Sequence, residues 1–160
     1  MVERVFPMTA DGKQQLEEEL ETLKLEKRPE VIERIKIARS FGDLSENSEY
    51  ESAKDEQSVL EGRIKQIQEM LKYAQVVDAT QAEADEVAIG KKVVFTEVGE
   101  DDPEEYIIVG SSESDPLSGK ISNNSPIANA LIGKKTGDVV SIATPGGEFD
   151  VEILEVTLAD

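Results

Sequence analysis

FGDLSENSEY, residues 41–50, separates two long runs of helix-forming residues and decides how this chain of 160 residues folds. Before it, apolar residues recur mostly at steps of three and four, as in a coiled-coil seam. That seam comprises Leu16, Leu20, Leu23, Val31, Ile35 and Ala38. After the stretch, the same alternation runs through Ala53, Gln57, Leu60, Ile64, Ile67 and Leu71. Either helix alone would leave its apolar stripe in water, so we expect an antiparallel α-helical coiled-coil hairpin.

The first helical run has a recognisable start and one irregularity. Thr9 precedes it and can serve as its N-cap. Around Pro29 the seam takes consecutive steps of four, which is a stutter, and the proline also removes one backbone donor. We therefore expect a local kink there and not a helix end. Arms of about 30 residues, at ~1.5 Å per residue, give the hairpin roughly 45 Å of reach.

Beyond residue 86 the apolar period changes to two, which is typical of strands. Residues 75–86 indicate a short strand or linker and then a polar loop. Strands are expected at Lys91–Thr96, Glu105–Val109, Val139–Thr144 and Phe149–Thr157, with one short helix at Ile127–Ile132. The second module is therefore an α+β domain with a twisted antiparallel sheet. We place the hairpin domain at 1–78 and the α+β domain at 79–160.

The composition excludes several classes of function. The chain has no Cys and no His, which removes thiol nucleophiles, zinc–thiolate sites and the usual general base. Its net charge of -18 disfavours self-sufficient binding to phosphate backbones. The charge is uneven, with a net of -6 over residues 1–78 and -12 over residues 79–160. No stretch resembles a signal peptide or a membrane span, so we expect a cytoplasmic protein with no membrane partner.

The turn between the helices carries two acids, Asp43 and Glu46, three residues apart. This spacing alone fits a capping box, with Asp43 as N-cap of the second helix and Glu46 three positions later. The alternative is that a narrow rod presents both carboxylates at its end as hard oxygen ligands for Mg²⁺. Two carboxylates fill only part of an octahedral shell, so such a tip would complete a metal site on another molecule. Asn47, Ser48 and Glu49 are further candidates for capping the second helix.

GDLSENSEYESAKDEQ, residues 42–57, resembles the signature of the Gre family of bacterial transcription elongation and transcript cleavage factors, in its GreA type. Glu61-Gly62-Arg63-Ile64 fits the same family. In the second module, its other signature is matched by Asn124-Ser125-Pro126-Ile127-Ala128, Leu131-Ile132-Gly133-Lys134 and Thr144-Pro145-Gly146-Gly147-Glu148. The resemblance covers nearly the whole chain, in the order of the two modules. It implies that the α+β domain is FKBP-like.

The resemblance also implies a function inside bacterial RNA polymerase. Family members insert the hairpin through the secondary channel, and the tip acids, here Asp43 and Glu46, help to hold a second Mg²⁺ in the polymerase active site. The polymerase then cleaves the backtracked nascent RNA, which rescues an arrested elongation complex. We therefore expect a cofactor of the polymerase that is not itself an enzyme, that holds no metal stably alone, and that is a monomer.

Two further contact regions are implied by the resemblance. In the family, a basic patch on the hairpin lies near the RNA 3′ segment, and here Arg34, Lys36 and Arg39 are nearest the tip. The alternative for these residues is a solvated surface with ion pairs, because most basic residues of the hairpin alternate with acids.

The second contact region is in the α+β domain, which is implied to dock at the rim of the channel. The candidate contact is Ser125, Pro126 and Ile127. The alternative for this segment is a helix start with Ile127 in the core. Many relatives carry Arg after Ser-Pro-Ile-Ala, where this chain has Asn129, so a charged contact is not expected there.

Three other functions stay open at this point. A paralogue of the same architecture could occupy the channel and inhibit the polymerase, although such paralogues alter the tip acids that are intact here. An FKBP-like chaperone or isomerase with a helical spacer is disfavoured by an aromatic content of 4% and the absence of Trp. A purely structural coiled-coil adaptor would use Asp43 and Glu46 as helix caps only.

Overall fold

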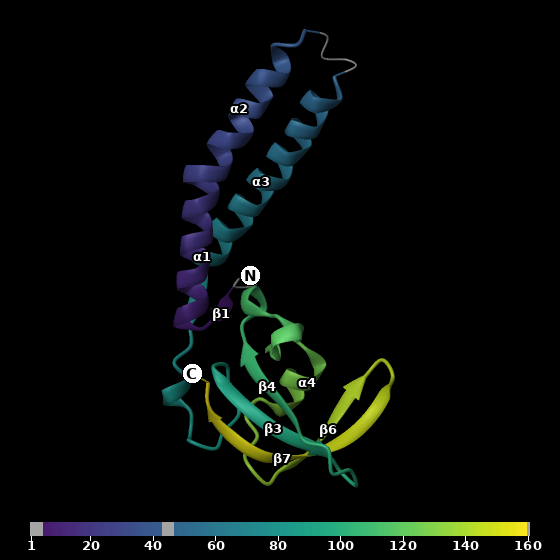
Figure 1. Ribbon diagram of the computed structural model, residues 1–160. Helices are drawn as coiled ribbons and strands as arrows, with labels where there is room; N and C mark the ends of the chain where they lie inside the picture. Colours follow the sequence, from purple (N-terminus) through teal and green to yellow (C-terminus); the bar gives the residue numbers. More distant parts are fainter. Residues whose placement is uncertain (1–4, 43–46, 160) are drawn as a thin grey trace, which may run out of the picture. The chain divides into compact units, whose positions relative to one another are not determined.

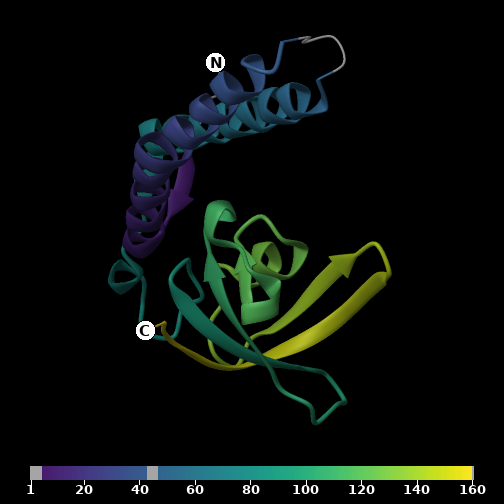
Figure 2. The same ribbon diagram turned by 45° about the horizontal axis from the view of Figure 1, so that its top comes forward.

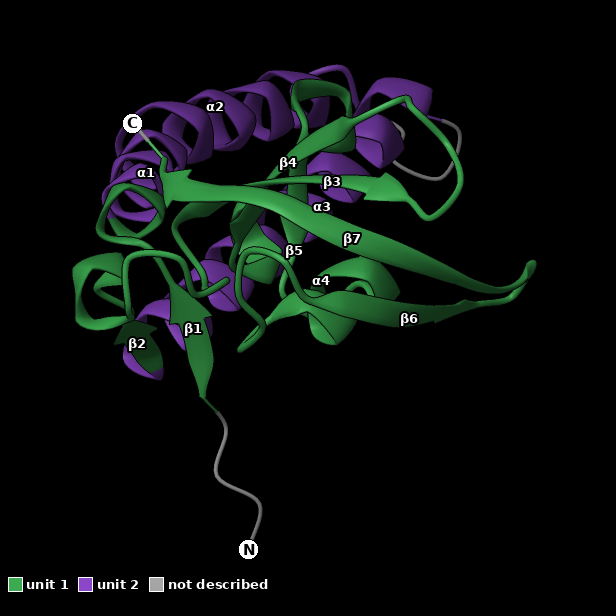
Figure 3. Ribbon diagram, turned by 90° about the horizontal axis from the view of Figure 1, so that it is seen from below, with its two compact units in different colours: residues 1–13, 74–160 green, residues 14–73 purple. Residues whose placement is uncertain are grey.

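The computed structural model describes residues 5–42 and 47–159, and its contacts divide the chain into two compact units (Figures 1 and 3). The hairpin unit comprises residues 14–73, and the sheet unit comprises residues 1–13 and 74–160. The start of the chain groups with the sheet unit because two short strands, one from each side of the hairpin, pair with each other.

The hairpin unit consists of two long antiparallel helical arms, as predicted. Its elements are α1 (Ala10–Thr22), a π-helix (Leu23–Lys27), α2 (Arg28–Arg39) and α3 (Ser48–Lys72). Among the described residues, ion pairs join the arms in reverse order: Glu19 with Arg63, Arg28 with Glu61, and Arg34 with Glu56. As the residue number rises along one arm, the number of its partner falls along the other.

The irregularity predicted around Pro29 is a π-helix immediately before it. The Arg28 N–H donates to the Leu23 carbonyl, five residues back instead of four. Pro29 then lies in the first turn of α2, where a missing N–H is tolerated. The arm continues without a break from the π-helix into α2.

The predicted seam lies between the arms and forms their core. Val31, Leu60 and Ile64 are buried together, with Leu20, Leu23 and Ile35 half-buried against them. At the end of α3 the seam shifts by one residue, because Met70 is buried and Leu71 only half-buried. Each fully buried aliphatic side chain contributes about 1.5–3 kcal/mol.

In the described part of the chain, no helix is both long enough and apolar enough to cross a membrane.

The sheet unit contains a five-stranded sheet in the order β5-β4-β3-β7-β6. Its strands are β3 (Lys91–Glu97), β4 (Glu104–Val109), β5 (Lys120–Ser122), β6 (Val139–Thr144) and β7 (Gly147–Leu158). Neighbouring strands are antiparallel except β4 and β5, which run parallel. Four strands confirm the prediction, whereas β5 and its parallel pairing are not indicated by the sequence pattern.

The core of the sheet unit lies between the curled sheet and α4 (Pro126–Leu131), which sits inside the curl (Figures 1 and 2). Alternate residues of β3 point into this core, as the period of two requires. The core packs Val93, Phe95, Ile108, Val151 and Ile153 of the sheet against Ala128 and Leu131 of α4. The α+β architecture expected for the second module is therefore confirmed.

A two-stranded parallel sheet joins the start of the chain to the segment after the hairpin. Its strands are β1 (Phe6–Met8) and β2 (Ala74–Val76). Thr9 then caps α1, because its Oγ1 accepts a hydrogen bond from the Gly12 N–H at 3.0 Å, which confirms the predicted N-cap. The Glu113 carboxylate in turn accepts from the Thr9 N–H at 3.0 Å.

Candidate functional site

The predicted site lies at the hairpin end, which the structure describes on both sides of residues 43–46. Asp43 and Glu46 themselves lie outside the described residues. On the near side, α2 ends at Arg39, and Gly42 has a φ of +101°. This left-handed backbone suits glycine, because a Cβ there would be strained. The chain therefore bends at Gly42, three residues after α2 ends.

Asn47 closes the far side of the turn and caps α3. Its Oδ1 accepts a hydrogen bond from the Tyr50 N–H at 3.1 Å, which is the geometry of an N-cap. Its Nδ2 donates to the Ala38 carbonyl at 2.7 Å. One side chain thus joins the first turn of α3 to the last turn of α2.

The position of this cap corrects the capping-box interpretation of the turn. The N-cap of α3 is Asn47, so the two positions that a capping box requires are Asn47 and Tyr50. Asp43 and Glu46 precede the cap in the sequence and therefore do not fill those positions. Their three-residue spacing is therefore not the capping box of α3.

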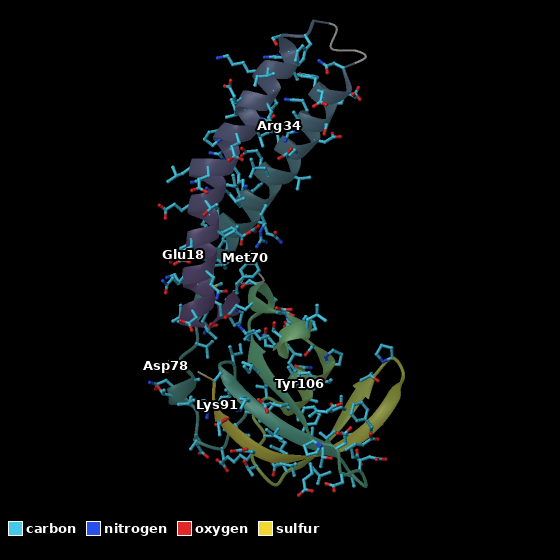
Figure 4. The ribbon with its side chains drawn as sticks, in the orientation of Figure 1. Glu18, Arg34, Met70, Asp78, Lys91 and Tyr106 are labelled. Atoms are coloured by element: carbon cyan, nitrogen blue, oxygen red, sulfur yellow. The ribbon has the colours of Figure 1, made fainter. Side chains whose placement is uncertain are left out.

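The three basic residues predicted to lie near RNA differ in their contacts. Arg34, labelled in Figure 4, forms an ion pair with Glu56 of α3, so it braces the two arms. Lys36 and Arg39 are exposed, and neither forms an ion pair with any described residue. Within residues 5–42 and 47–159, they are therefore the two basic residues of this group that form no ion pair.

An apolar hollow lies beside the turn on the α2 side. It has a volume of about 300 Å³ and is lined by Ile37, Ala38 and Phe41, with Arg34 and Glu49 at its edge. Phe41 is 72% exposed and Ile37 is 49% exposed. Neither residue belongs to the seam, and neither is among the predicted site residues. An aromatic residue next to the turn and outside the seam period is the sequence signal that identifies this hollow.

Two bidentate ion pairs stiffen the arms that carry the turn. Arg28 donates to both oxygens of Glu61 at 2.8 Å, and Arg63 donates to both oxygens of Glu19 at 2.8 and 2.9 Å. Hydrogen bonding from Arg28 lowers the pKa of the Glu61 carboxyl. The fork geometry fixes both side chains, unlike a single contact between flexible chains.

In the sheet unit, the predicted docking segment begins α4. The Ser125 Oγ accepts a hydrogen bond from the Ala128 N–H at 3.2 Å, so Ser125 is the N-cap. Ile127 packs partly buried against the core, whereas Pro126 and Asn129 are exposed. Ser125 and Ile127 thus have structural roles, and only Pro126 of the three offers its side chain freely. Docking through this segment stays a prediction.

The donor set at the turn suits Mg²⁺ in kind but not in number. Two carboxylates supply hard oxygen ligands, and an octahedral ion requires six. Within residues 5–42 and 47–159, no group of three or more His, Cys, Asp or Glu side chains is arranged to hold a metal ion. The remaining ligands would therefore have to come from another molecule or from water.

Comparison with known protein families matches both modules. The model described as "Transcription elongation factor, N-terminal" matches residues 6–76. The model described as "Transcription elongation factor, GreA/GreB, C-term" matches residues 81–158. Together the two matches span nearly the entire chain.

Similar proteins of full length carry the same description. The chain is 62% identical over 154 residues to the transcription elongation factor GreA of Limosilactobacillus fermentum, covering 96% of this chain and 98% of that protein. It is 61% identical over 155 residues to GreA of Lactococcus lactis subsp. lactis, covering 97% and 99%. Among solved structures, GreA factor homolog 1 of Thermus thermophilus aligns at 25% identity over 96% of this chain and 99% of the other, with a TM-score of 0.45.

Proposed function

The chain belongs to the GreA/GreB family of transcription elongation factors, and on that premise we propose that it enters the secondary channel of bacterial RNA polymerase and stimulates cleavage of backtracked nascent RNA. The bond is broken in the active site of the polymerase, so this chain is a cofactor and not an enzyme. The observation that carries the proposal is the cap at Asn47. Because Asn47 caps α3, a capping box in α3 does not account for Asp43 and Glu46 in the sequence, which supports a different role for them.

The length, narrow cross-section and stiffness of the hairpin support its proposed entry into a channel. α3 has 25 residues, which is roughly 37 Å at ~1.5 Å per residue. Its cross-section is two helices, held by an apolar seam and by the bidentate Arg28–Glu61 and Arg63–Glu19 pairs. A stiff rod loses little conformational entropy on binding, because its two arms are already held together before binding.

At the polymerase site, Asp43 and Glu46 act as ligand donors. Carboxylates are the hard oxygen ligands that Mg²⁺ prefers, and these two would fill two of its six positions. A Mg²⁺ ion held there would supply activation of the attacking water and stabilisation of the leaving oxygen of the phosphodiester. The polymerase and water supply the other ligands. Because the polymerase carries out the hydrolysis and this chain supplies only ligands, the chain needs neither His nor Cys for this role.

Other surfaces of the chain guide the RNA and the polymerase in this proposal. Lys36 and Arg39, which form no ion pair with a described residue, attract the phosphates of the extruded 3′ segment, whereas Arg34 is paired with Glu56. Pro126 at the exposed start of α4 is the proposed contact with the rim of the channel. The protein acts as a monomer in the bacterial cytoplasm, where the polymerase works.

Transcript shortening tests the proposal directly. A bacterial elongation complex is stalled in a backtracked position with labelled RNA, and the protein is added with Mg²⁺. We expect faster appearance of shortened RNA than in the polymerase-only control. Equal rates with and without the protein would refute the proposal, and slower cleavage would indicate a channel-blocking inhibitor. As a matched pair, Lys36→Gln with Arg39→Gln should raise the protein concentration needed, whereas Lys24→Gln with Lys27→Gln should not.

A further inference from the structure

The hollow beside the hairpin turn exposes apolar side chains that the proposed function does not use. Its accessible walls are Phe41, which is 72% exposed, and Ile37, which is 49% exposed. The hollow has a volume of about 300 Å³, at the lower end of the range for ligand sites. Two large apolar side chains gathered at one accessible hollow favour contact with another molecule, whereas single exposed apolar residues are ordinary.

The edge of the hollow offers hydrogen-bonding groups of both kinds. Arg34 lies at the edge, and its ion pair with Glu56 holds the guanidinium group in place (Arg34 is labelled in Figure 4). A guanidinium has several N–H donors, so the ion pair leaves others to face an occupant. Glu49 also lies at the edge, where its carboxylate is an acceptor, and it forms no ion pair with any described residue.

Apolar walls with a donor and an acceptor at the edge match a nucleobase. A base has flat apolar faces and carries donors and acceptors around its edge, and unpaired bases stack on aromatic rings. A metal ion would find one acidic side chain in the lining, that of Glu49. An apolar peptide segment would cover Arg34 and Glu49 without satisfying their hydrogen-bonding groups.

The cations near the hollow suit the phosphates that accompany a base. Lys36 and Arg39 are exposed and form no ion pair with a described residue. At 3.6 residues per turn they project from a different side of α2 than Ile37. A strand of a few nucleotides that crosses the end of α2 can therefore present its phosphates to these cations while one base enters the hollow.

We propose that the hollow binds one base of the extruded 3′ segment of the nascent RNA. This inference rests on the function proposed above, which brings an unpaired RNA strand to the hairpin end. Phe41 stacks on the base, and Ile37 packs against it. Arg34 and Glu49 form hydrogen bonds with groups on the edge of the base. Because every base has a π face, stacking accepts transcripts of any sequence.

Cleavage of backtracked complexes that carry chemically defined RNA tests this inference. One RNA has normal bases in its extruded segment and the other has abasic nucleotides there, and each rate is divided by that of the polymerase alone. With normal bases, Phe41→Ala should lower the stimulation at subsaturating protein about fivefold or more, because stacking is lost. Phe41→Trp keeps an aromatic face and should stimulate about as well as wild type. With abasic RNA, wild type should fall to the level of Phe41→Ala.

Val59→Ala is the matched control, because Val59 is 75% exposed on α3 and does not line the hollow. It should match wild type on both RNAs. Equal stimulation by wild type and Phe41→Ala on normal RNA would overturn the subsite alone. A Phe41→Ala defect of the same size on abasic RNA would also overturn it, and would indicate that the hollow contacts the polymerase. Absence of stimulation by wild type on either RNA would instead refute the proposed function, and the subsite with it.

Discussion

Replacing Asn47 by alanine should loosen the hairpin end by roughly 2 kcal/mol. The change removes the N-cap bond to the Tyr50 N–H, and loss of a cap costs about 1 kcal/mol. It also removes the bond from Nδ2 to the Ala38 carbonyl, and a hydrogen bond of this kind contributes about 1 kcal/mol net. Both contacts belong to the hairpin unit, so the loss should be confined to its helices.

The measurement is hydrogen exchange of backbone amides in the first turn of α3, together with denaturant unfolding followed by far-UV circular dichroism. Asn47→Asp keeps the cap acceptor but loses the donor to Ala38, so its cost should be about half that of the alanine variant. Ser48→Ala, at the next, exposed position, is the matched control and should change stability little. If Asn47→Ala matches wild type in both measurements, Asn47 is not the cap and the capping role of Asp43 must be reconsidered.

Three further predictions concern the stability of the hairpin unit and the sheet unit. Gly62 is an exposed residue of α3, and a Cβ added there would have no other atom within 4 Å. Gly62→Ala should therefore stabilise the hairpin by about 0.5–1 kcal/mol, measured by denaturant unfolding. Gly110→Ala should destabilise the sheet unit by about 1–3 kcal/mol in the same assay, because the new Cβ would overlap the Pro7 carbonyl oxygen. Arg28 lowers the pKa of Glu61 below its ordinary 4.5, so the stability from this pair is complete above 4.5 and is lost as pH falls through the lowered value. Unfolding at a series of acidic pH values should show this loss in wild type, and a smaller one in Glu61→Gln.

The hairpin could be predicted from the sequence because its signal is local and repeated. Each arm shows its seam several times over, and the turn between them is too short for any other arrangement. The π-helix was foreseen only as a stutter near Pro29. A four-residue step marks where the register changes, but not how many backbone hydrogen bonds shift to absorb it.

The pairing of β1 with β2 could not be predicted, because each strand has only three residues. Three residues show no period, and their partner lies across the entire hairpin in the sequence.

The burial of Lys91 is a similar case. Lysine at the start of a strand suggests exposure, yet it is 1% exposed, with its Nζ donating to the carbonyls of Glu83 and Ala84 at 2.7 and 3.1 Å. Those acceptors come from a loop whose path has no sequence signature.

The cap of α3 shows why the site was only partly predictable. Asp43, Ser45 and Asn47 are all good N-cap residues, and propensity ranks them nearly equally. The choice is made by tertiary contact, because the Asn47 side chain also reaches the Ala38 carbonyl of the other arm. A carboxylate could accept at the cap but could not donate to that carbonyl, which explains why an amide occupies this position.

The most direct test of the central claim is the dependence of transcript cleavage on Mg²⁺ concentration at saturating protein, for wild type and Asp43→Asn. If Asp43 contributes a ligand to Mg²⁺ in the polymerase active site, the variant should need more Mg²⁺ for cleavage. Even at saturating Mg²⁺, cleavage should be at least about tenfold slower, which is equivalent to ~1.4 kcal/mol or more. Its hairpin stability and its occupancy of the polymerase should match wild type. A variant that cleaves at the wild-type rate, or that slows only in proportion to a destabilised hairpin, would contradict the account.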